Sequence, residues 1–168
     1  IDPPTVSNVN YFPSESVASV AFVPVAADGT FCVETLVPVH VIVDITGVFT
    51  ADGQLRFVAA QPSRVLDTRI ALGGWSPLHG SGQTLDVRAV PPGARAMTGT
   101  ITLVAPLRPG FLKSYPCGAE PPTSSVNAPT GAVLANGVTI GVNGDGRVCV
   151  TARAATHTLL DVTGWWVP

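Results

Sequence analysis

The clearest β-hairpin pattern in this chain lies at residues 138–150, which read VTIGVNGDGRVCV. From Val138 to Val142, larger apolar residues alternate with Thr and Gly, and a period of two is typical of a strand with one buried face. The Gly-Asp-Gly at residues 144–146 favours a tight hairpin turn, because an Asp-Gly pair readily adopts positive φ angles. Residues 148–150 then predict the returning strand. The stretch as a whole indicates an antiparallel β fold.

The same pattern occurs a second time near the start of the chain. Ser7 aligns with Ser124, and this offset of 117 continues without a gap to the end of the sequence. Identical pairs at this offset include Asp28/Asp145, Cys32/Cys149, His40/His157 and Asp44/Asp161. A tandem repeat of this kind is a supersecondary unit that needs a neighbour to bury its apolar face. We therefore expect residues 1–50 to be the C-terminal half of a first repeat and residues 51–168 to be a complete second repeat.

Composition restricts the class of protein. The chain has 168 residues, 46% of them hydrophobic and only 12% charged, with a net charge of -2. This length and composition allow a buried core. The nine Lys and Arg residues form no basic run, so binding to nucleic acid has no electrostatic support. The sequence also lacks an apolar run of the roughly 18–20 residues that would span a bilayer.

Turn-forming residues interrupt every candidate helix. With 17 Gly and 16 Pro spread along the chain, we expect an all-β protein without significant helix. Strands are predicted in the first copy at 21–25, 31–33 and 39–46. In the second repeat they are predicted at 55–69, 83–90, 96–105, 110–116, 138–142, 148–150 and 156–163. About seven or eight short strands per repeat favour antiparallel β-sandwich repeats, with a closed β-barrel as the second choice.

Several motifs occur in order along the chain. In the second repeat they are Ser63-Arg64-Val65-Leu66-Asp67-Thr68-Arg69, Tyr115-Pro116-Cys117-Gly118, PTSSVN at 122–127, Gly146-Arg147-Val148-Cys149-Val150 and Leu160-Asp161-Val162-Thr163-Gly164-Trp165-Trp166. This set resembles the Leu-Asp-Thr-Arg / Val-Asp-Val-Thr-Gly-Tyr-Phe tandem repeats of secreted actinobacterial proteins, and the resemblance covers the whole chain. It implies export and a non-catalytic, accessory role at the cell surface.

The three cysteines follow from the resemblance and the repeat. Cys117 and Cys149 lie at family-like positions in strand-like segments, so the resemblance implies that they form a disulfide in an oxidising compartment. Cys32 is the repeat equivalent of Cys149. The counterpart of Cys117 would fall just before residue 1, so we expect Cys32 to be unpaired within this chain or to bond to another polypeptide.

Three pairs of polar residues are candidate sites with a stronger structural interpretation. His40 and His157 each precede an Asp by four residues, which suggests metal or general-base chemistry, but such positions in a strand lie about 13 Å apart. We expect Asp44 and Asp161 to accept backbone N–H bonds from the turn that follows. Asp67 and Arg69 are expected to form an ion pair on one strand face rather than to act in catalysis.

Two loops invite a binding interpretation. Residues 143–146, Asn-Gly-Asp-Gly, resemble the start of a calcium loop but lack the later acidic ligands, so a turn is the better interpretation. Residues 70–82 form the longest stretch without strand character and contain Trp75 and His79. An exposed Trp can stack on a sugar face, whereas the structural alternative is a Trp folded over the edge of the sandwich.

These observations predict a secreted, non-enzymatic module without a cofactor, metal site or catalytic residue. Its first candidate activity is binding of cell-wall or extracellular polysaccharide, with Trp75 and His79 as the candidate contacts. The alternative is a structural subunit that assembles through strand pairing, either with itself or with an upstream segment of a precursor. Hydrolytic activity is the weakest alternative, because the sequence contains no Gly-x-Ser-x-Gly, His-Glu-x-x-His or phosphate-loop motif.

Overall fold

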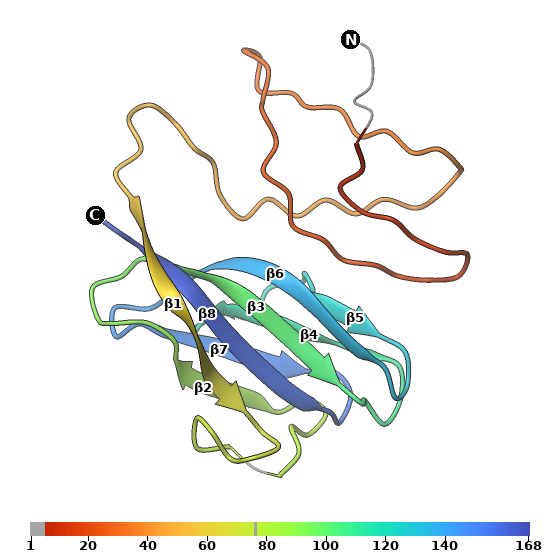
Figure 1. Cartoon of the computed structure of the whole chain (residues 1–168), viewed down its shortest axis with the longest axis vertical. Coiled ribbons are helices and arrows are strands. Elements are labelled where there is room, and N and C mark those ends of the chain that lie inside the picture. The colour runs from red at the N-terminus through yellow and green to blue at the C-terminus, as the bar shows by residue number, and fades with distance from the viewer. Residues whose placement is uncertain (1–5, 76) are drawn as a thin grey trace.

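The computed structural model describes residues 6–75 and 77–168. Its regular structure consists of eight antiparallel strands, all of them between Arg56 and Val167 (Figure 1). They are β1 (Arg56–Asp67), β2 (Thr84–Arg88), β3 (Ala96–Val104), β4 (Gly110–Pro116), β5 (Val126–Ala128), β6 (Val133–Gly141), β7 (Arg147–Ala152) and β8 (His157–Val167). The prediction of an all-β fold is confirmed. Within the described residues, no helix has the length and apolar character to cross a membrane.

The strands form two four-stranded sheets that pack face to face. One sheet has the order β1-β8-β3-β6 and the other β2-β7-β4-β5. Each sheet has free outer strands among the described residues, so the domain is the predicted sandwich and not a closed barrel. Every neighbouring pair joins one strand of β1–β4 to one strand of β5–β8. The strands β1–β4 and the strands β5–β8 therefore alternate throughout both sheets.

Alternation of side chains explains the core. In β3, every second residue is buried, from Met97 to Leu103. β8 adds Leu160 and Val162 from the same sheet. The facing sheet contributes a matching set: Leu85, Val87, Leu112, Val126, Val148 and Val150. Because strand side chains alternate between faces, these apolar positions meet between the two sheets.

The turn at residues 143–146 forms as predicted, but the hairpin does not. The Asn143 Oδ1 atom accepts hydrogen bonds from the backbone N–H groups of Asp145 (3.1 Å) and Arg147 (2.9 Å). Gly146 has a φ of 75°. However, β6 and β7 belong to different sheets, so this turn carries the chain across the sandwich. Alternation indicates which face of a strand is buried, but it does not indicate which strand is its hydrogen-bonded neighbour. The hairpin prediction was wrong for this reason.

Residues 6–54 form no regular strand (Figure 1). The structure therefore lacks the strands predicted at 21–25, 31–33 and 39–46. The predicted Asp-Gly turn is still present: the backbone N–H of Ala26 donates to the carbonyl of Thr30 (2.9 Å). A four-residue turn needs only local contacts, whereas a strand needs a neighbour. The segment rests on the outer face of the first sheet, where the rings of Phe49 and Trp166 lie 5.5 Å apart.

Candidate functional site

A charged cluster surrounds Asp67 at the end of β1. Asp67 is 1% exposed, and its carboxylate accepts hydrogen bonds from Arg69 Nε (2.9 Å), Arg69 Nη2 (2.7 Å) and the Arg69 backbone N–H (3.0 Å). Hydrogen bonds from Arg69 lower the pKa of Asp67 to about 2, although burial opposes this shift. The predicted ion pair is confirmed, but it lies in the turn after β1 and not on one strand face.

Arg64 is the member of this cluster that sequence reasoning missed. Its guanidinium binds Asp161 of β8 in a bidentate manner, with Nε to Oδ1 at 2.7 Å and Nη2 to Oδ2 at 2.9 Å. It also donates to Asp67 through Nη1 at 3.2 Å. The expectation that Asp161 accepts turn N–H groups was wrong, because the carboxylate faces the neighbouring strand. Arg64 belongs to the 63–69 motif, and its place beside Asp67 and Arg69 in that motif was the sequence signal for its role in the cluster.

The two histidines of the second repeat are bound to threonines. Nδ1 of His157 lies 3.1 Å from Thr68 Oγ1, so it bonds across to the end of β1 and not to Asp161. His79 is 1% exposed, and its Nε2 lies 2.8 Å from the Gln83 carbonyl oxygen. Because a carbonyl only accepts, Nε2 carries the proton and Nδ1 accepts from Thr158 Oγ1 at 3.0 Å. Burial lowers the pKa of His79.

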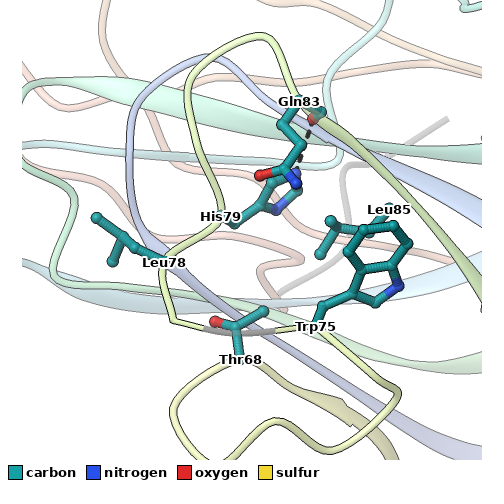
Figure 2. A pocket seen from close by; sticks show the side chains of 6 residues that line it. All are labelled: Thr68, Trp75, Leu78, His79, Gln83 and Leu85. Atoms are coloured by element: carbon teal, nitrogen blue, oxygen red, sulfur yellow. Dashed lines mark hydrogen bonds between the residues drawn. The ribbon is translucent and has the colours of Figure 1, made fainter.

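Figure 2 shows that His79 and Trp75 line one small hollow. Its other lining residues are Thr68, Leu78, Gln83 and Leu85, and its volume is about 20 Å³. A space of this size holds about one water molecule. Trp75 is half-buried and packs against the core. The candidate ligand contact His79 is thus enclosed, and both of its ring nitrogens are bonded within the protein.

Cys117 and Cys149 form the predicted disulfide, with their Cα atoms 4.9 Å apart. It joins the end of β4 to β7. Asp86 lies beside both sulfur atoms, but sulfurs bonded to each other are not thiolate ligands for a metal. Cys32 is exposed and makes no disulfide, as predicted.

The half repeat, defined here as residues 7–50, exposes the side chains that its second copy buries. At the repeat offset, Val43 and Ile45 correspond to Leu160 and Val162. Leu160 and Val162 are 0% and 2% exposed, whereas Val43 and Ile45 are 51% and 73% exposed. Asp44, between them, is also exposed, and no bond to its carboxylate is found among the described residues. These apolar side chains of the half repeat are therefore not enclosed between two sheets, although the segment lies on the first sheet.

Comparison of the chain with protein-family profiles and with curated proteins finds no match in either. The resemblance of its motifs to secreted repeats thus stays a prediction.

Proposed function

We propose that this chain is a non-catalytic assembly module of an exported protein, in which the half repeat binds another polypeptide by β-strand pairing. The observation that carries the proposal is the contrast between two copies of one pattern. The copy at 124–167 is buried in a sandwich, and the copy at 7–50 is exposed. Burying one Val or Ile side chain stabilises a protein by about 1.5–3 kcal/mol. Val33, Val43 and Ile45 are each more than half exposed, so a partner that covers them gains part of this stabilisation.

The polar groups of the second repeat support a non-catalytic role. The carboxylate of Asp67 is held by two arginines, and both nitrogens of His79 have partners within the protein. A general acid or base has to reach a substrate atom, and these groups are occupied by structural contacts. The disulfide is compatible with export, because disulfides persist mainly in oxidising compartments.

Removal of the first 50 residues should abolish self-association and leave the sandwich folded. All six strand pairings lie within residues 56–167, so residues 51–168 should fold alone and sediment as a monomer. The full chain should show an apparent mass that rises with concentration, because its apolar segment is exposed. Sedimentation velocity over a concentration series measures both.

A full chain carrying Val43→Ser and Ile45→Ser is the matched control. It keeps the length of the segment but loses apolar area, so it should associate more weakly than the unchanged chain. A full chain that stays monomeric at every concentration would contradict the proposed function.

Glycan binding is the second candidate function, and the partly exposed ring of Trp75 in the 70–82 loop favours it. If this ring stacks on a sugar, Trp75→Ala should weaken binding to insoluble cell-wall polysaccharide by about 10-fold. A sedimentation assay with the polysaccharide measures this loss, and Leu107→Ala, at another exposed apolar position, is the control. Unchanged binding together with a lower melting temperature would assign Trp75 to the core instead.

A further inference from the structure

We infer which polypeptide the half repeat binds, and this inference rests on the proposed assembly function. The partner is a first-half segment of the same repeat type, equivalent to residues 56–116 and the cysteine that follows them. It completes a second sandwich with residues 7–50 and forms a disulfide with Cys32.

The interleaved sheets determine how many strands the partner supplies. At the repeat offset, β5–β8 correspond to residues 9–11, 16–24, 30–35 and 40–50. In the complete repeat β8 and β6 are separated by β3, and β7 and β5 are separated by β4. No two strands of the second half are therefore hydrogen-bonded neighbours. A partner that adds one strand at an edge leaves most of the half repeat unpaired. A partner that inserts equivalents of β1–β4 gives every strand of the half repeat a hydrogen-bonded neighbour.

Two polar residues of the half repeat indicate which motif the partner carries. Asp44 and His40 correspond to Asp161 and His157. In the complete repeat, Asp161 binds Arg64 and His157 bonds to Thr68, and both of these partners belong to the 63–69 motif. A carboxylate that meets a guanidinium in this geometry is specific in charge and direction. The partner is therefore expected to present an Arg and a Thr four residues apart, as this motif does.

Cys32 sets the register of the other sheet. It occupies the position of Cys149, which bonds to Cys117 just after β4. Cys32 is exposed and free, so a partner whose cysteine follows its β4 equivalent brings that thiol against Cys32. The resulting bond requires an oxidant such as oxidised glutathione, which accepts the two electrons and the two thiol protons that the cysteines release.

A second copy of this chain can cover apolar area of the half repeat, but it brings no first half that is free to complete the two sheets. Residues 1–168 contain one first half, at 56–116, and it is already paired with the second half at 124–167. The half repeat can reach a first half of this chain only by displacing residues 124–167, and that exchange would appear as a disulfide between Cys32 and Cys117.

The test places a first half directly before the half repeat. The probe is an extended chain in which a copy of residues 51–118 is placed before Ile1 of the full protein, followed by oxidation in a glutathione buffer. We expect peptide mapping to find Cys32 bonded to the cysteine of the added segment, and Cys117 still bonded to Cys149. Amides of residues 7–50 should gain protection from hydrogen exchange, and the self-association of the full chain should disappear.

Charge exchange tests the register independently of the cysteines. In the extended chain, Asp44→Arg should increase the opening of the half repeat by about 10-fold in hydrogen exchange, because it sets two guanidinium groups together. Replacing the added copy of Arg64 with Asp should restore protection. Asp52→Arg, an exposed position in the turn at 50–53, is the control and should have no effect.

The outcomes separate this inference from the proposed function. A free Cys32 with unprotected amides in the extended chain, or a Cys32–Cys117 bond, overturns the inference. The proposed function still stands in that case if the unextended chain associates through residues 7–50. A monomeric unextended chain contradicts the proposed function itself.

Discussion

Replacing Cys149 with Ser should lower the free energy of unfolding by about 3–4 kcal/mol. The disulfide joins residues 32 positions apart, and closing a loop of this length restricts the unfolded chain by about that amount in the chain-entropy estimate. Cys32→Ser is the same substitution at the repeat-equivalent position. It should change the free energy of unfolding by less than about 0.5 kcal/mol, because Cys32 is exposed and makes no disulfide.

Urea denaturation under non-reducing conditions measures both variants. Reduction should bring the unchanged protein down to the stability of the Cys149→Ser variant and should leave that variant unaffected. If Cys149→Ser unfolds at the same urea concentration as the unchanged protein, the disulfide does not stabilise the sandwich.

Replacing Asp67 with Ala should lower the free energy of unfolding by about 2–4 kcal/mol. The substitution removes the acceptor for both arginines and leaves the backbone N–H of Arg69 without its partner. Asp67→Asn should cost less, since an amide oxygen still accepts the backbone bond. Because this effect acts on stability, loss of an enzymatic activity with an unchanged melting temperature would contradict the structural role of Asp67.

The same carboxylate predicts a pH dependence. The pKa of Asp67 is about 2 in the folded protein, whereas that of an ordinary Asp side chain is 3.8. A depressed folded pKa means that the stabilisation is fully present above about pH 4 and is lost as the pH falls toward 2. The difference in stability between the unchanged protein and Asp67→Asn should therefore shrink across this range. Denaturation midpoints that run parallel from pH 5 to pH 2 would contradict the assigned ion pair.

Local patterns were enough to predict most strands of the second repeat. The prediction of 110–116 matches β4, and 96–105 matches β3 to within one residue. Alternation reports which side of a strand is buried, and Gly and Pro mark where a strand ends. The short strand β5 was not predicted separately, because three residues do not establish a period.

Sequence separation decided how much of the polar site was predictable. Asp67 and Arg69 are two residues apart, so their ion pair followed from the motif alone. Arg64 and Asp161 are 97 residues apart, and only the pairing of β1 with β8 brings them together. His79 was placed in an open loop because its enclosing partners, Thr158 and the carbonyl of Gln83, are brought around it by the fold.

A comparison of residues 124–167 with residues 7–50 shows what the sequence determines by itself and what the tertiary structure decides. By itself, the sequence determined the turn at 26–30, the turn at 143–146 and the face of each segment that is apolar. The tertiary structure decided that residues 124–167 form four strands whereas residues 7–50 form none. The physical reason is that every ladder of this sandwich joins one strand of β1–β4 to one strand of β5–β8. A second half therefore makes its backbone hydrogen bonds and apolar contacts only where a first half is inserted between its strands.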